Sequence, residues 1–129
     1  MKVTKRWRYW AGAVAGFAIT SGLGPLMDPK PYNVPIFNAV RAIAPWSVWA
    51  ACWLAVAVLA AWTMVTRRAW AWRASVLGSI AIGGTWLFGV SWEHWVNDRP
   101  VSPTGLALWA WYLATNMIAA TSRHQFEGA

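Results

Sequence analysis

The chain has 129 residues, of which 58% are hydrophobic, 13 are Trp and only 12% are charged. A soluble domain usually carries roughly 25% charged residues because its surface faces water, so this composition excludes an ordinary soluble domain. Eleven bases and four acids give a net charge of +7, which fits nucleic acid or an anionic membrane surface as a partner. The single cysteine, Cys52, excludes an internal disulfide.

Four segments without Lys, Arg, Asp or Glu divide the chain, and they contain 19, 25, 19 and 23 residues. About 20 helical residues cross a hydrocarbon core of roughly 30 Å, so each segment is long enough to span a membrane. Each is also apolar around its whole circumference, as a lipid-embedded helix must be. The sequence therefore predicts an all-α membrane domain over residues 1–129, with transmembrane helices near 8–26, 46–66, 74–96 and 104–122.

Helix-breaking residues mark the ends of these spans. Gly24 and Pro25 end the first helix, and Pro45 precedes the second. Ser102 and Pro103 open the fourth as a capped start with Pro in the first turn. The basic N-terminus and short apolar run also fit a signal peptide, but Pro25 lies where cleavage would fall, so we expect an uncleaved span.

The loop after the first span has two parts. "DPKPYNVP" contains three prolines in eight residues and is expected to be extended and stiff. In residues 36–44, "IFNAVRAIA", the large apolar residues fall on one helical face and Asn38 and Arg41 on the other. This pattern predicts a short amphipathic helix on the outer membrane surface, and a plain loop is the alternative.

The stretch "RRAWAWR", residues 67–73, lies between the second and third spans. We expect a short loop whose arginines contact anionic headgroups and whose Trp70 and Trp72 lie at the interface. Nucleic-acid binding needs an ordered basic surface that seven membrane-bound residues do not offer, so we expect no nucleic-acid partner. The wider set of predicted interface anchors is Arg6, Trp7, Arg8, Trp10, Trp46, Trp49, Arg67, Arg68, Trp70, Trp72, Arg73, Trp92, Trp95 and Trp109.

The distribution of basic residues predicts the orientation. With four spans, both termini and the 67–73 loop lie on one side of the membrane. That side holds Lys2, Lys5, Arg6, Arg8, Arg67, Arg68, Arg73 and Arg123, and the other holds Lys30, Arg41 and Arg99. Basic residues concentrate in cytoplasmic loops, so both termini are predicted to be cytoplasmic.

Small residues recur at a spacing of four in two predicted spans. They are Gly12, Gly16, Thr20 and Gly24 in the first and Ser75, Ser79 and Gly83 in the third. Small side chains let another helix backbone approach closely in a membrane. The partner is either a helix of the same bundle or a helix of another copy, and the pattern leaves both open.

Signals of catalysis and transport are sparse. No ionisable residue lies in the middle of a span, although ion and proton pathways usually need one. In "WEHW", residues 92–95, Glu93 and His94 are adjacent and so point about 100° apart on a helix, which favours an interfacial anchor over a metal site. We expect no enzyme activity, no catalytic or metal site and no cofactor, and a transporter is the weakest of the functions that we consider.

Three segments carry a resemblance. They are "PIFNAVRAIAPWSVWAACWLA", "RASVLGSIAIGGTW" and "SPTGLALWAWYLATNMIAA". This layout of an amphipathic helix, Pro and Trp-rich spans resembles the small four-span membrane proteins of tailed phages that infect actinobacteria, some of which are called holin-like. The resemblance implies a multi-pass protein of the host's cytoplasmic (inner) membrane that oligomerises and permeabilises it during lysis.

The alternative is a non-lytic phage protein that excludes superinfection or modifies the host envelope. In either case the expected partners are the lipid bilayer with its anionic headgroups, further copies of the chain, and other phage or host membrane proteins.

Overall fold

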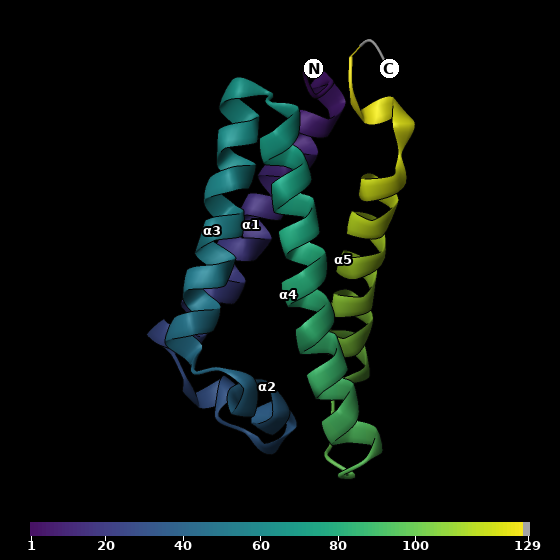
Figure 1. The fold of residues 1–129 in the computed structure, drawn as a ribbon. Helices are drawn as coiled ribbons and strands as arrows, with labels where there is room; N and C mark the ends of the chain where they lie inside the picture. Colours follow the sequence, from purple (N-terminus) through teal and green to yellow (C-terminus); the bar gives the residue numbers. More distant parts are fainter. Residues whose placement is uncertain (128–129) are drawn as a thin grey trace.

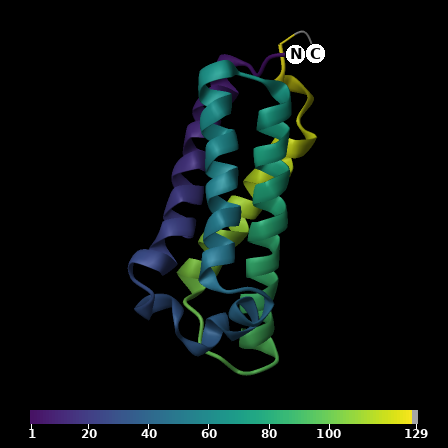
Figure 2. The same ribbon diagram turned by 60° about the vertical axis from the view of Figure 1, so that its left-hand side comes forward.

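The computed structural model describes residues 1–127 and is all-α in this range. Four long helices lie side by side, as both ribbon views show (Figures 1 and 2). They are α1 (Lys5–Met27), α3 (Trp46–Thr66), α4 (Ala69–Trp95) and α5 (Pro103–Thr121). The two termini and the α3–α4 turn lie at one end of the protein, here called the terminal end. The opposite end, called the loop end, holds the remaining connections.

The connection from α1 to α3 at the loop end is mostly helical. It contains the 3-10 turns η1 (Lys30–Tyr32) and η2 (Pro35–Phe37) and the short helix α2 (Asn38–Ile43). A helix is therefore present within 36–44, as the amphipathic pattern predicts. Val40 of α2 is fully buried against Gly89 of α4. A Cβ on Gly89 would lie only 2.9 Å from the Val40 Cγ2 atom. Packing against α4 therefore holds this six-residue helix, which is too short to be stable alone.

The predicted helix ends agree with the structure where local signals are strong. The predicted span 46–66 coincides with α3, and Pro103 opens α5 one residue before the expected start. The Ser102 hydroxyl accepts a hydrogen bond from the Gly105 amide at 3.3 Å, which is the predicted N-terminal cap. The prediction that Gly24 and Pro25 end the first helix is wrong, because Pro25 lies inside α1, two residues before its end at Met27.

The prediction of a seven-residue loop at 67–73 is wrong. Only Arg67 and Arg68 connect the helices, and α4 begins at Ala69. Arg67 makes this tight turn by adopting a left-handed conformation with φ of 56°, which is typical of the residue that ends a helix. The 27 residues of α4 extend for about 40 Å, so its first five residues, up to Arg73, can extend beyond a hydrocarbon core of about 30 Å.

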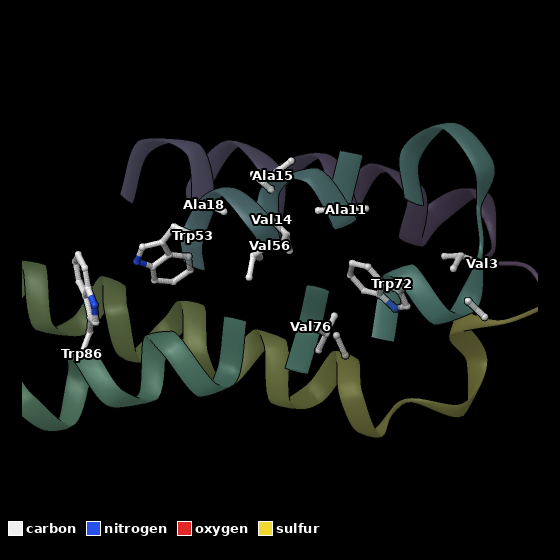
Figure 3. Packing of buried hydrophobic residues seen from close by; sticks show 14 of the residues in the cluster. Val3, Ala11, Val14, Ala15, Ala18, Trp53, Val56, Trp72, Val76 and Trp86 are labelled. Atoms are coloured by element: carbon white, nitrogen blue, oxygen red, sulfur yellow. The ribbon is translucent and has the colours of Figure 1, made fainter. Parts of the chain in front are cut away.

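Three of the helices, α1, α3 and α4, are long and apolar enough to cross a membrane. α5 has 19 residues, and its polar residues, among them Asn116, lower the mean hydropathy of its most apolar stretch of 18 residues below that of the other three. α1 packs mainly on α3, and α4 packs on both α3 and α5. Figure 3 shows the buried side chains between these helices, with Ala11, Ala15 and Ala18 of α1 on one side and Trp86 of α4 on the other.

Candidate functional site

The lateral surface of the bundle carries large apolar side chains on all four long helices. Tyr9 of α1 is 77% exposed, Val65 of α3 79%, Phe88 of α4 67% and Trp111 of α5 71%. Soluble monomers rarely expose contiguous apolar patches of more than a few hundred Å². An apolar surface around the whole bundle therefore fits contact with lipid tails or with other membrane helices.

Charged residues lie only toward the two ends of the bundle. Lys2, Lys5, Arg6, Arg8, Arg67, Arg68, Arg73 and one acid, Glu127, belong to the terminal end. Asp28, Lys30, Arg41, Glu93, Asp98 and Arg99 belong to the loop end. Arg123, which is predicted to lie with the first group, has a side chain outside the described part of the structure. The molecule thus has an apolar middle between a basic end and an end of mixed charge.

Backbone hydrogen bonds join the two termini to the α3–α4 turn. Residues 2–4, Arg67 and residues 125–127 form this terminal clasp. The Val3 amide donates to the Arg67 carbonyl at 2.8 Å, and the Thr4 amide donates to the Gln125 carbonyl at 2.9 Å. The Arg67 guanidinium donates to the Val3 carbonyl at 2.7 Å and forms an ion pair with Glu127. The clasp holds the start of α1 and the segment after α5 together at the basic end.

The predicted interface tryptophans divide into exposed and buried residues. Trp70 is 58% exposed, as an anchor should be, but Trp72 is fully buried and donates from Nε1 to Gln125 Oε1 at 2.6 Å. Trp49 is also buried, and its Nε1 donates to the Val40 carbonyl at 3.0 Å. Both indole N–H groups have their hydrogen-bond acceptor inside the protein, whereas the sequence predicts that these two rings lie at the membrane interface.

The other predicted anchors keep some exposure. Trp92 and Trp95 are 50% and 75% exposed, and Trp10 is 37% exposed. Trp7, Trp46, Trp109 and Arg67 are partly buried, and the exposed arginines are Arg6, Arg8, Arg68 and Arg73. These side chains are accessible at the surface of the protein, in contrast to Trp49 and Trp72.

The small residues of α4 lie inside the protein. Ser75, Ser79 and Gly83 are buried, and Ser79 Oγ accepts a hydrogen bond from the Tyr112 hydroxyl of α5 at 2.9 Å. A Cβ on Gly83 would lie 3.9 Å from both Trp109 and Tyr112. The α4 stripe therefore packs within one chain and joins α4 to α5.

The small residues of α1 do not share one environment. A Cβ on Gly12 would lie 3.2 Å from Met64, and a Cβ on Gly24 would lie 2.7 Å from the Tyr32 hydroxyl. Gly16 has open space at the same position, and both Gly16 and Thr20 are exposed. The Thr20 hydroxyl donates to the Gly16 carbonyl at 3.0 Å. Only the middle of this stripe, Gly16 and Thr20, presents a small-residue surface to the outside.

Three glycines in close contacts were not identified from the sequence. A Cβ on Gly22 would lie 3.0 Å from the Cβ of Trp53, and a Cβ on Gly78 or Gly89 would lie 2.9 Å from Val56 or Val40. The sequence does contain a pattern that predicts the contact of Gly22 with another helix. Small residues at 11, 15, 18 and 22 recur at alternating spacings of four and three, as in a helix–helix contact.

Aromatic rings fill the bundle toward the loop end. Trp86 is at the centre, with its ring centroid 5.3 to 6.2 Å from the rings of five neighbours. These neighbours are Phe37, Trp46, Trp49, Trp53 and Trp109. Most of these pairs are edge-to-face, the arrangement that aromatic quadrupoles favour. The cluster therefore ties the α2 region, α3, α4 and α5 together.

Two indole N–H groups of this cluster have no hydrogen-bond partner in the described part of the protein. They belong to Trp53 and Trp86, which are buried. The two rings are 5.9 Å apart at 88°, and Figure 3 shows the nitrogen of Trp53 on the side of its ring toward Trp86. Burial of these two unpaired N–H groups costs free energy, which the edge-to-face contacts of the cluster offset in part.

Cavities lie on both sides of the aromatic cluster. One of about 220 Å³ lies between the η1–η2 region and the facing parts of α4 and α5, and one of about 230 Å³ lies between α1 and the start of α5. Both border on Phe37, Trp86, Gly105 and Trp109. Their walls are mainly apolar, which fits an apolar occupant better than a polar substrate.

Two further cavities lie along the seam between α1 and α5. The one nearer the terminal end, of about 160 Å³, is lined by Arg6, Trp7, Trp10, Thr115 and Ile118. The next, of about 380 Å³, is lined by Trp10, Ala13, Val14, Phe17, Leu108, Trp111, Tyr112 and Thr115. The two cavities adjoin at Trp10 and Thr115, which border both, and together they are here called the seam groove.

The "WEHW" segment completes the C-terminal end of α4. Glu93 is 5% exposed and accepts a hydrogen bond from Asn97 Nδ2 at 3.0 Å, and its carbonyl accepts one from the Arg99 amide. His94 Nδ1 lies 2.8 Å from the Arg99 carbonyl oxygen. Within residues 1–127, His, Cys, Asp and Glu form no group of three that could hold a metal ion. The polar groups of this segment thus stabilise the turn that follows α4.

A comparison with known protein families, curated proteins and solved structures finds no match to this chain.

Proposed function

We propose that the protein is an integral membrane protein with four spans and with the terminal end in the cytoplasm of a bacterial host. The apolar lateral surface between two charged ends supports insertion. α5 runs between the same two ends as α4 and packs along it (Figure 1), which supports a fourth span despite its lower hydrophobicity. The eight-to-three excess of basic residues at the terminal end supports the orientation.

Reporter fusions test this topology. A reporter that is active only in the cytoplasm is expected to be active at both termini and after Arg68, and inactive in the loops at residues 28–45 and 96–102. A reporter that is active only outside the cell should give the reverse pattern. External activity of a C-terminal fusion would contradict the even number of spans.

We further propose a holin-like function, in which copies of the chain accumulate in the cytoplasmic membrane, associate and permeabilise it. The observation that supports association is the open surface at Gly16 and Thr20 on α1, where a second helix could approach the backbone closely. This function requires no catalytic group. Other phage or host membrane proteins are further candidates for the same surface.

Inducible expression in an actinobacterial host tests permeabilisation. We expect the membrane potential and then the culture density to fall after induction, together with a crosslinked ladder of oligomers in isolated membranes. Gly16→Leu should preserve insertion, because Leu favours the bilayer by about 0.3–0.6 kcal/mol, but should shorten the ladder and delay the fall. Confirmed insertion with an unchanged potential would reject the holin-like proposal.

A non-lytic role in superinfection exclusion or envelope modification is the second candidate. It is favoured by the apolar character of the exposed helix faces, such as Val58 and Val65 of α3 and Leu77 and Phe88 of α4. A water-filled hole needs a polar lining, and these faces do not supply one. In the same experiment this candidate gives insertion and oligomers without a loss of membrane potential.

A further inference from the structure

The seam groove exists because α1 and α5 pack on different partners. α1 lies mainly on α3, and α5 lies on α4. Large rings separate the two helices where they meet, and Phe17 stacks on Tyr112 with ring centroids 3.7 Å apart. Phe17 lines the groove far from the terminal end, where a further cavity shares Phe17 and Leu108 with it, and Leu108 and Trp111 at the edge are 62% and 71% exposed. The groove is thus open to the side of the bundle.

The groove changes character along its length. Its mouth, at the terminal end, contains the cationic side chain of Arg6 and the edge-to-face pair Trp7 and Trp10. Farther in, the lining is almost entirely apolar, with Ala13 and Val14 on α1. A cation at one end of an apolar groove matches a molecule with an anionic head and an apolar tail.

The length of the groove also matches such a molecule. From Arg6 to Phe17 the helix rises by about 16 Å, which is close to half of a hydrocarbon core of roughly 30 Å. The groove therefore extends over the depth of one leaflet, from the level where headgroups lie to the middle of the bilayer.

We propose that the seam groove binds one anionic phospholipid of the cytoplasmic leaflet, with its phosphate at Arg6 and one acyl chain along the groove to Phe17. Basic pockets between membrane helices on the cytoplasmic side are suited to anionic headgroups, and Trp7 and Trp10 are placed as interfacial residues. The assignment of the leaflet rests on the orientation proposed above, but the binding itself does not.

A helix from a second copy fits the groove less well. A helix is about 10 Å across. To enter the groove as far as its floor it would have to separate Phe17 of α1 from Tyr112 of α5, whose ring centroids are 3.7 Å apart. A single acyl chain is much thinner than a helix and needs no movement of α1 or α5.

The test uses the full-length protein in nanodiscs, which have no cytoplasmic side, so the result does not depend on the orientation. Retained lipid is measured by native mass spectrometry after incubation with phosphatidylglycerol or with phosphatidylcholine. We expect one tightly retained phosphatidylglycerol per chain. Arg6→Gln should weaken its retention about fivefold, the effect of one basic residue near an anionic headgroup. Arg8→Gln removes the same charge from an exposed position outside the groove and should have little effect.

A second pair of variants tests the acyl-chain part of the groove. Ala13→Phe places a ring in the groove and should reduce retention more than tenfold, whereas Ala55→Phe, at an exposed position of α3, should not. Excess inorganic phosphate should not displace the lipid, since the acyl chain contributes to binding.

Four outcomes would overturn the proposal. They are equal retention of both lipids, equal effects of the two arginine variants, displacement by phosphate alone, and crosslinks that place α1 of a second copy in the groove. If reporter fusions show the opposite orientation while phosphatidylglycerol is still retained through Arg6, the proposed topology fails and the lipid site stands.

Discussion

Replacing Gly22 with Leu is expected to disrupt the protein more than any other glycine substitution in α1. A Cβ at this position would lie 3.0 Å from the Trp53 Cβ and 3.3 Å from the Ala50 carbonyl oxygen. The first contact is to the root of a buried side chain and the second to backbone, so neither can move without separating α1 from α3. Overpacking a well-packed interior costs about 1–3 kcal/mol, and Leu adds three more carbon atoms beyond that Cβ.

Thermal unfolding of the purified protein in detergent measures this effect, and Gly16→Leu is the matched control. The control makes the same substitution in the same helix at a position with open space. In the detergent-solubilised monomer, where the proposed association through Gly16 makes no contribution, we expect a clear fall in the unfolding temperature for Gly22→Leu. The value for Gly16→Leu should be unchanged, with both variants inserted to the same level. Equal unfolding temperatures for the two variants would contradict the observed packing of α1 on α3.

Trp86→Ala is the substitution for which we expect the largest loss of stability. The ring is 1% exposed and contacts rings from the α2 region, α3 and α5. Large-to-small substitution of a buried Trp costs roughly 3–5 kcal/mol in soluble proteins. In a membrane the unfolded helices remain in lipid, so the loss comes from packing and less from transfer to water. We therefore expect a value near the lower end of that range.

Trp95→Ala provides the control for this prediction, because Trp95 lies on the same helix and is 75% exposed. Unfolding in detergent, followed by near-ultraviolet circular dichroism, should show a lower transition temperature and a weaker aromatic signal for Trp86→Ala. Trp86→Phe should recover part of both. If Trp95→Ala lowered the transition temperature as much as Trp86→Ala, the aromatic cluster would not be what holds the bundle together.

The positions of the helices follow from the sequence because their determinants are local. A charge-free segment of about 20 residues, a proline before the first turn and a capping serine act within a few residues of where they stand. α3 accordingly begins and ends where predicted, and Ser102 caps α5. The start of α4 was misplaced because Arg67, Arg68 and Arg73 were interpreted as a loop, although a helix can extend beyond the apolar core and carry basic residues there.

The environment of each side chain was decided only by the tertiary structure. Trp70 and Trp72 are two residues apart on a helix and therefore point in nearly opposite directions, but the sequence does not show which of them faces the protein. The answer depends on Gln125, 53 residues away from Trp72, which accepts the hydrogen bond of the buried indole.

Tertiary packing also decides the environment of each glycine and forms the seam groove. Gly16 and Gly22 are equivalent in local propensity, yet one faces open space and the other touches the Trp53 side chain and the α3 backbone. Arg6 and Thr115 line a common cavity because α1 packs on α3 while α5 packs on α4. Local sequence determines where helices form in a membrane, whereas close packing between distant segments determines which of their faces meet, because lipid tails and apolar side chains are equally hydrophobic.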